Sequence, residues 1–285
     1  VAKINLKGEI TTEVIRYLYL QDGLNRVEVE EVAAGDIVAV AGIESISIGE
    51  TLTDPENPVA LPSISVEEPT VQMAFGVNTS PFTGKEGRWA TSRKIRERLF
   101  QELKSNVSLR VQDTESADTF IVSGRGELHL AISIETMRRE GYEFQVSRPQ
   151  VIYKTGTDGK KEEPFEEVHI ETSKDTVGPI VEMLGKRRGE MTNMSESTSG
   201  GIILTFIVPS RGILGFRHHF LTATRGLGIM NSIFHGYQKM AGAIASRSRG
   251  SLVAWEPGAT TTFGLKNAEE RGILFLKPGV DVYAG

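Results

Sequence analysis

The chain has 285 residues and a mass of 31.2 kDa, enough for roughly two to four small domains with cores of their own. Hydrophobic residues make up 39% and charged residues 24%, and no apolar run approaches the length that spans a bilayer. The absence of cysteine excludes a disulfide scaffold, a thiol nucleophile and a cysteine-based zinc site. We expect a globular protein of the cytoplasm with no membrane partner.

The net charge of −5 conceals a strong asymmetry along the chain. Residues 1–70 carry 4 Lys or Arg against 13 Asp or Glu, a balance of −9. Residues 174–249 carry 10 Lys or Arg against 4 Asp or Glu, a balance of +6. A cluster of positive charge on one surface attracts the phosphate groups of nucleic acids. Charge alone leaves two interpretations open, which are a solvated surface and a nucleic-acid-binding surface.

Residues 1–62 have the pattern of short strands joined by tight turns. Strand signals occur at residues 27–32, 37–41 and 49–52. These strands are too few to close a barrel or a sandwich, so the chain is expected to begin inside a β-domain. Three prolines then predict a linker: Pro55, Pro58 and Pro62.

A first α/β unit is predicted from residue 69 onward. Strand and helix patterns alternate in the order βαββαβ, over residues 71–77, 91–106, 108–112, 119–123, 126–139 and 142–146. In the first helix, Ile95, Leu99 and Leu103 stand four residues apart and therefore share one face. This order is that of the ferredoxin-like split βαβ fold.

A second copy of that order is predicted, over residues 165–171, 177–186, 191–194, 201–208, 213–225 and 227–234. After Gly236 the chain is predicted to become β again, over residues 251–255, 260–264 and 273–276. The predicted fold class is therefore α+β and multidomain. It combines a partial β-barrel, two ferredoxin-like βαββαβ domains and a partial β-rich C-terminal domain.

The motifs of nucleotide-binding and catalytic sites do not occur in this sequence. The phosphate-binding pattern G-x-x-x-x-G-K-[ST] is absent, and so is the G-x-S-x-G elbow of serine hydrolases. Glu127 and His129 are two residues apart on a predicted helix and point to nearly opposite faces, so they cannot share a cation. We predict no catalytic residue, metal site or cofactor in this chain. An enzyme on the ferredoxin-like fold stays open only by analogy, because a fold alone does not give a function.

A cluster of basic residues is the candidate site. Lys186, Arg187 and Arg188 stand where the first helix of the second unit is predicted to end. Cations there complement the helix C-terminus, but three consecutive side chains point in three directions, so only some can serve the helix dipole. Further arginines follow in the same region: Arg211, Arg217, Arg225, Arg247 and Arg249. Because guanidinium groups suit phosphate contacts and stack on bases, this set is predicted to bind folded RNA through its backbone and shape.

Several strings in the chain resemble one protein family. They are NTSPF at residues 78–82, GKEG at 84–87, SGRGELHL at 123–130, KRRG at 186–189 and VPSRGILGFR at 208–217. Together they are similar to domains III and V of the TypA/BipA translational GTPases, and the resemblance covers nearly the whole chain. SGRGELHL is shared with elongation factor G and LepA, whereas NTSPF and GKEG are more selective. About 15 residues, from Pro149 to Glu163, separate the two units, too few for the extra domain of elongation factor G.

The resemblance implies a division of the chain into four parts. They would be the C-terminal part of a translation-factor β-barrel (1–62), domain III (63–148), domain V (149–236) and the truncated start of a family-specific C-terminal domain (237–285). GTP and Mg²⁺ would be bound by a GTP-binding domain that this chain lacks. By resemblance, Lys85, Arg93 and Arg125 would face that domain.

The resemblance also implies a function. The chain would be the ribosome-binding portion of a translational GTPase that docks between the ribosomal subunits and acts in ribosome assembly and stress-adapted translation. Its partners would be the ribosome, ribosomal RNA, ribosomal proteins and its own GTP-binding domain, while the chain itself would not hydrolyse GTP. Two alternatives stay open, a LepA-like translation factor and an RNA-binding module that acts off the ribosome.

Overall fold

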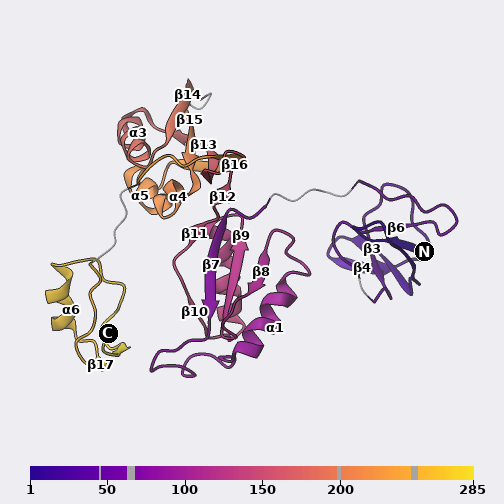
Figure 1. Ribbon diagram of the computed structural model, residues 1–285, viewed down its shortest axis with the longest axis horizontal. Helices are drawn as coiled ribbons and strands as arrows, with labels where there is room; N and C mark the ends of the chain where they lie inside the picture. The colour runs from indigo at the N-terminus through magenta and orange to yellow at the C-terminus, as the bar shows by residue number, and fades with distance from the viewer. Residues whose placement is uncertain (45, 63–67, 198–199, 245–249) are drawn as a thin grey trace.

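The computed structural model describes residues 1–44, 46–62, 68–197, 200–244 and 250–285. Figure 1 shows an N-terminal β region, two α/β units and a small C-terminal part along the chain. Residues 71–151 are called the first unit, residues 154–239 the second unit and residues 250–285 the C-terminal segment. In all described ranges, no helix combines the length and the apolar character needed to cross a membrane.

The N-terminal region contains two three-stranded antiparallel sheets. The first has the order β2-β1-β6, with β1 at Ala2–Ile4, β2 at Ile10–Thr12 and β6 at Thr51–Thr53. The second has the order β4-β3-β5, with β3 at Tyr17–Asp22, β4 at Asn25–Glu28 and β5 at Val38–Ala41. The strand predicted at 27–32 ends at Glu28, whereas the strand at 37–41 is confirmed. Neither sheet closes into a barrel within the described part of the chain.

The first unit has the predicted βαββαβ order. Its elements are β7 (Val71–Gly76), α1 (Ser92–Glu102), β8 (Arg110–Asp113), β9 (Thr119–Gly124), α2 (Glu127–Arg139) and β10 (Gln145–Val146). The antiparallel sheet has the order β10-β7-β9-β8, which is the strand order 4-1-3-2 of a ferredoxin-like fold. Beside β10, the short strand β11 (Gln150–Val151) also pairs with β7.

The core of the first unit lies between the sheet and both helices. Phe75 and Phe120 come from the sheet, Leu99 from α1 and Leu130 from α2, and each is at most 2% exposed. Leu99 follows the buried Ile95 by one helical turn, as the four-residue spacing predicts. The predicted strand at 142–146 shrinks to two residues because Tyr142 makes a bridge with Trp89 instead.

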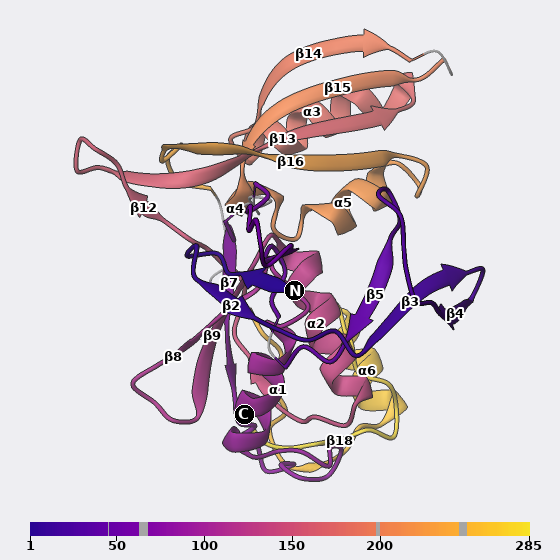
Figure 2. The ribbon, with the colours of Figure 1, turned by 90° about the vertical axis from the view of Figure 1, so that its right-hand side faces the viewer.

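The second unit repeats the order with longer strands. Its elements are β12 (Lys154–Thr155), β13 (Lys161–Thr172), a 3₁₀ turn η1 (Lys174–Thr176), α3 (Val177–Lys186), β14 (Glu190–Glu196), β15 (Ile202–Pro209), α4 (Ser210–Ile213), α5 (Phe216–Ala223) and β16 (Ile229–Lys239). β16 pairs with β13, and β13, β15 and β14 follow in that order, as Figure 2 shows. The sheet order is again 4-1-3-2, so both predicted ferredoxin-like folds are confirmed.

The predicted helix at 213–225 is wrong in one respect, because two short helices replace it. Gly215 adopts a left-handed φ of 68°, which separates α4 from α5. The core still forms as the periodicity indicates, since Phe216 and Phe220 of α5 pack with Ile180 and Leu184 of α3 on one face of the sheet. The hydrophobic residues of each unit therefore form a core of their own.

The C-terminal segment differs most from the prediction. The three strands predicted at 251–255, 260–264 and 273–276 are wrong. Residues Thr262–Glu269 form helix α6, and Gly258–Ala259 (β17) pairs with Asp281–Val282 (β18). The helix begins where the Thr261 hydroxyl accepts the N–H of Gly264, and the strong helix formers of residues 265–270 extend it. Local capping therefore outweighs the β-branched residues that suggested a strand.

Candidate nucleic-acid interface

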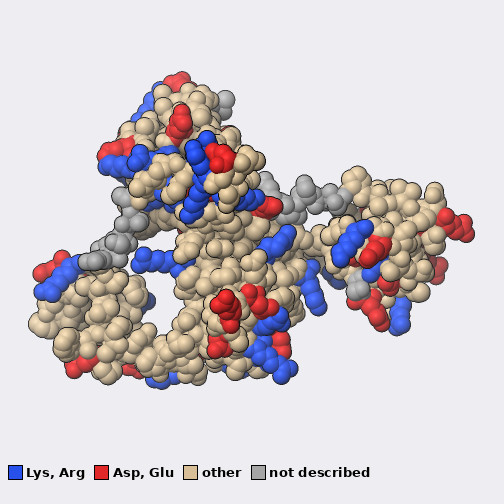
Figure 3. Space-filling model, in the orientation of Figure 1, with Lys and Arg blue, Asp and Glu red and all other residues tan. Residues whose placement is uncertain are grey.

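The basic residues that the sequence singles out gather at the helical layer of the second unit. Figure 3 shows Lys and Arg side chains over the region of α3, α4 and α5. The described members are Lys186, Arg187, Arg188, Arg211, Arg217 and Arg225, whereas Arg247 and Arg249 lie outside the described residues. The described members divide into those that face solvent and those that are used inside the fold.

Helix α3 ends in a motif that turns Arg188 outward. The Arg188 N–H donates to the carbonyl of Gly185 at 3.1 Å, and the Gly189 N–H donates to the carbonyl of Leu184 at 2.8 Å. These two bonds define a Schellman motif, in which the residue after the helix cap takes the left-handed conformation. Arg188 takes it with φ 66°, and its side chain is exposed.

Helix α5 ends in the same motif. The Arg225 N–H donates to the carbonyl of Thr222 at 3.3 Å, and the Gly226 N–H donates to the carbonyl of Leu221 at 2.8 Å. Arg225 is left-handed with φ 53° and is also exposed. A hydrogen bond from Ser173 and, to a smaller extent, the charge of Arg225 lower the pKa of Asp175, which stands just before α3. Arg225 therefore lies near the start of α3, whereas Arg188 follows its end.

An arginine in each of these positions is costly for the backbone. Glycine is the usual residue there, because a side chain in the left-handed region costs about 1–2 kcal/mol. Arg188 and Arg225 are the two non-glycine residues with positive φ in the described part of the chain. Non-glycine residues in such conformations concentrate at functional sites. The outlying backbone angles therefore single out two of the predicted RNA-binding residues.

Arg187 is used inside the fold. Its Nη1 donates to the carbonyl of Gly212 at 2.7 Å and to that of Leu214 at 3.2 Å, and its guanidinium lies 5.3 Å from the centre of the Phe216 ring. Burial lowers the pKa of Arg187, and the carboxylate of Glu127 acts in the opposite direction. An arginine remains protonated even so. Arg187 thus ties the end of α3 to the α4–α5 turn.

Arg211 is also held by the fold. Its guanidinium meets both carboxylate oxygens of Glu163, which is fully buried, and it also donates to the carbonyl of Gly242. The second oxygen distance is 3.1 Å, and the same Glu163 oxygen accepts the N–H of Ala241 at 2.8 Å. Arg188 donates through Nε to the carbonyl of Ala243 at 3.1 Å. Residues 241–243 are thus held where the chain leaves the second unit.

Lys186 and Arg217 are exposed. Lys186 pairs with Glu182 one helical turn earlier at 2.5 Å, a contact that costs little to break in water. Arg217 is the second residue of α5 and lines a cleft between the two units. Both side chains are therefore free to reach a phosphate.

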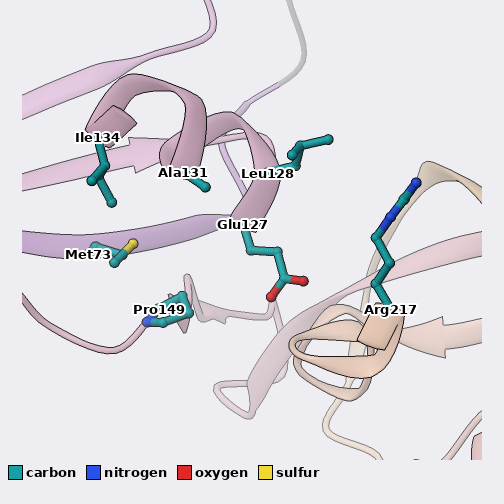
Figure 4. A pocket seen from close by; sticks show the side chains of 7 residues that line it. All are labelled: Met73, Glu127, Leu128, Ala131, Ile134, Pro149 and Arg217. Atoms are coloured by element: carbon teal, nitrogen blue, oxygen red, sulfur yellow. The ribbon is translucent and has the colours of Figure 1, made fainter. Parts of the chain in front are cut away.

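Beside the cleft between the units, the turn between α4 and α5 of the second unit contacts the first unit. Leu214 packs against the core of the first unit, and the Gly215 N–H donates to the Glu127 carboxylate at 2.9 Å. Figure 4 shows Glu127 and Arg217 on opposite sides of this cleft. Its other lining residues in that view are Met73, Leu128, Ala131, Ile134 and Pro149. Arg125 lines a neighbouring part of the same cleft.

His129 has a structural role beside this cleft. Its Nδ1 accepts the N–H of Arg125 at 3.3 Å, and its Nε2 lies 3.1 Å from the side-chain oxygen of Asn106. Burial lowers the pKa of His129 and the charge of Arg125 lowers it further, which favours the neutral ring. A Cβ at Gly124 would lie 2.9 Å from the ring, so the SGRGELHL string fits this packing closely.

The three residues predicted to face a GTP-binding domain come from the β7–α1 loop, the first turn of α1 and the turn before α2. Arg125 lines the cleft between the units, and Lys85 lies 4.4 Å from the centre of the Phe82 ring. Arg93 is exposed in the first turn of α1, with Glu97 as its partner at 2.9 Å.

Sequence patterns did not point to Glu163, Glu127 or Leu214, because the roles of these residues depend on distant partners. Glu163 stands in the acidic run of residues 162–167, which suggests a solvated strand rather than a buried carboxylate. Within the described ranges, no group of His, Asp and Glu side chains could hold a metal ion. The candidate site therefore combines exposed cations at and near the ends of α3 and α5 with Arg187 and Arg211, which backbone carbonyls and the buried Glu163 hold inside the fold.

Comparison with protein families matches two consecutive parts of the chain. Residues 160–248 match the model described as elongation factor G C-terminus, and residues 249–285 match the TypA/BipA C-terminal domain. Among solved structures, the crystal structure of ttk003000868 from Thermus thermophilus has a TM-score of 0.49 and 17% sequence identity. That match covers 84% of this chain and 51% of the other.

Curated relatives match over nearly the whole chain. A protein of Synechocystis sp. named "Large ribosomal subunit assembly factor BipA" is 52% identical over 100% of this chain, and its namesake in Bacillus subtilis is 47% identical over the same share. The Arabidopsis thaliana "Putative elongation factor TypA-like SVR3, chloroplastic" is 51% identical over 94% of the chain. This chain spans 47% of the length of each bacterial relative and 40% of the plant one.

Proposed function

The chain belongs to the TypA/BipA family, and on that premise we propose that it is the ribosome-docking portion of a translational GTPase. It would contact ribosomal RNA through the helical layer of the second unit, with ribosomal proteins as further partners. Two of the relatives above are named as assembly factors of the large ribosomal subunit, which supports this choice. The proposal implies that the protein acts in the cytoplasm and takes part in ribosome assembly.

The backbone at two helix ends carries the proposal. Arg188 and Arg225 adopt the left-handed conformation where glycine costs least, and both side chains are exposed, although the Nε of Arg188 also donates to the carbonyl of Ala243. Helix capping alone does not explain arginine there, since the same hydrogen bonds would form with glycine. Lys186 and Arg217 extend the same basic surface. Arg187 and Arg211 would support it from inside.

The test is co-sedimentation of the chain with ribosomes at two salt concentrations. The double variant Arg188→Gly/Arg225→Gly should weaken binding and flatten its salt dependence. Removing one phosphate contact should lower the slope of log affinity against log salt by about 0.7–0.9. Lys104→Ala is the matched control, because it removes an exposed cation from the first unit. Unchanged binding and salt dependence in the double variant would overturn the proposal.

The same assay separates ribosome docking from RNA binding off the ribosome. Docking predicts that intact ribosomes bind the chain more tightly than an equal mass of free ribosomal RNA. Equal affinity for both would favour the free-standing RNA-binding module.

We propose that GTP and Mg²⁺ are bound by a part of the longer protein outside these residues. The chain spans about half of its relatives, and its sequence has no phosphate-binding loop with the lysine and serine or threonine that GTP binding needs. Arg93 and Lys85 are candidate contacts to that part, because both are exposed and neither is among the residues that line the cleft. A calorimetric titration that finds one stoichiometric GTP site in this chain would contradict the assignment.

We also propose the division into domains at residues 62/63, 148/149 and 236/237, with β11 (Gln150–Val151) crossing back to pair with β7 of the first unit and β16 continuing past the last boundary to Lys239. The separate hydrophobic cores of the two units support the middle boundary. Limited proteolysis followed by mass mapping tests all three boundaries.

A further inference from the structure

The loop between β7 and α1 is organised by one carboxylate. Glu143 accepts the side-chain N–H of Asn78 and the backbone N–H of Gly84 through one oxygen, each at 2.8 Å. Its other oxygen accepts the backbone N–H groups of Glu86 at 3.1 Å and Gly87 at 3.0 Å. Four hydrogen bonds thus converge on one side chain from across the first unit.

This arrangement explains the two glycines of the GKEG string. Gly84 has a φ of 82°, which a side chain rarely adopts. A Cβ on Gly87 would lie 2.5 Å from the Cβ of Glu143, so no larger residue fits without moving that carboxylate. The loop is therefore built to a defined shape rather than left as a flexible connection.

Phe82 lies in this loop and is half-buried. The Nζ of Lys85 lies 4.4 Å from the centre of the Phe82 ring, and the Thr83 hydroxyl bonds to the carbonyls of Asn78 and Ser80, each at 2.7 Å. The ring of Tyr283 meets Phe82 edge-on, with centroids 5.3 Å apart and an angle of 88° between the planes. Edge-to-face packing at this separation is favourable for aromatic rings.

Tyr283 is held by a second polar centre in the C-terminal segment. The Thr260 hydroxyl donates to the carbonyl of Lys277 at 2.7 Å and accepts the N–H of Val280 at 3.0 Å. The Thr260 backbone adds bonds to Val280 at 2.9 Å and to Gly279 at 2.8 Å. The turn of residues 277–280 is thus fixed, and β18 (Asp281–Val282), which directly precedes Tyr283, pairs with β17.

We propose that the loop of residues 78–87 is the docking element for the chain's own C-terminal segment, with Phe82 as the contact that receives Tyr283. The segment is then held near its C-terminal end, while the chain that precedes it is attached separately to the second unit. The bonds to residues 241–243 hold the chain before it on the second unit, and Phe82 holds its far end on the first unit. Glu143 positions the loop of residues 78–87, and Thr260 positions the turn that precedes Tyr283.

The absence of cysteine allows a direct test in the full chain by paired spin labels. Labels on Glu86→Cys and Lys277→Cys use exposed side chains on the two faces and leave both aromatic rings in place. Docking predicts a single narrow distribution of distances between the labels. Tyr283→Ala should broaden it, and Glu143→Gln should broaden it too, because an amide nitrogen would face N–H donors.

Phe275→Ala is the matched control, since it removes an aromatic ring that is 92% exposed in the same segment. It should leave the distribution narrow. A broad distribution in the doubly labelled chain that carries no further substitution would overturn the proposal. A narrow distribution that persists when Tyr283→Ala is added would also overturn it. Circular dichroism of each variant shows whether it is folded. If Glu143→Gln is not folded, Thr260→Val repeats the test by loosening the turn that precedes Tyr283.

Discussion

Glu163 and Arg211, which are 48 residues apart in the chain, form an ion pair in which the carboxylate is fully buried. The pair also binds the backbone of Ala241 and Gly242, so it joins β13, α4 and the end of β16. An arginine that the charge pattern assigned to RNA is thus engaged within the fold.

Arg211→Ala should lower the free energy of unfolding by about 3–5 kcal/mol, because it leaves the buried Glu163 carboxylate without its partner. Lys186→Ala removes an exposed cation of the same basic surface and should change stability by no more than about 0.5 kcal/mol. Calorimetric melting of both variants makes the comparison. A melting temperature of Arg211→Ala equal to that of the parent chain would contradict the assignment.

Arg225→Gly should raise the free energy of unfolding by about 0.5–1 kcal/mol. Glycine removes the left-handed strain of about 1–2 kcal/mol but offsets part of that gain through its greater freedom in the unfolded chain. Arg188→Gly should raise the free energy of unfolding by a smaller amount, because the hydrogen bond from the Arg188 side chain to the carbonyl of Ala243 is lost. Denaturant titration measures both values. A stability loss in Arg225→Gly would mean that the side chain serves the fold.

The stability that Glu143 provides should depend on pH. Desolvation raises the pKa of Glu143, but the hydrogen bonds from Gly84, Asn78, Glu86 and Gly87 together outweigh it and hold the pKa below its ordinary value near 4.5. A depressed pKa in the folded state means that the contribution is present above the unfolded pKa and is lost as the pH falls through the folded one.

The difference in melting temperature between the parent chain and Glu143→Gln should therefore be constant near pH 7 and shrink below about pH 4.5. Melting curves between neutral and acid pH measure it. A difference that grows on acidification would show that the carboxylate is not the acceptor in the folded chain.

Leu214→Ala should uncouple the two units. Leu214 belongs to the second unit but packs against the core of the first, so its removal should cost about 2 kcal/mol and separate one melting transition into two. Ile213→Ala is the matched control, because Ile213 packs against the core of its own unit. It should lower the stability of the second unit without dividing the transition. A single transition in Leu214→Ala would show that other contacts join the units.

Regular elements with strong periodicity were predictable from the sequence. The spacing of Ile95 and Leu99 indicates a helix with one apolar face, and the observed α1 buries both side chains. Helix α3 occupies residues Val177–Lys186 as predicted. Such patterns suffice because burial of one face outweighs other local preferences over three turns or more.

Elements set by single residues were not predictable. The helix predicted at 213–225 divides at Gly215, where the left-handed turn lets the N–H of Gly215 reach Glu127 in the other unit. The strand predicted at 260–264 is a helix because the Thr261 hydroxyl caps it. A glycine or threonine has several possible local uses, and neighbouring segments select among them.

The two βαββαβ patterns, the excess of cations after residue 174 and the strings that resemble the TypA/BipA family can all be read from the order of residues. Which cations face solvent depends on the folded chain. Arg187 and Arg188 are neighbours in sequence, yet Arg187 bonds to the carbonyls of Gly212 and Leu214 while Arg188 turns outward through a left-handed backbone. The physical reason is that charge is a property of a residue, whereas its availability depends on acceptors that distant parts of the chain supply.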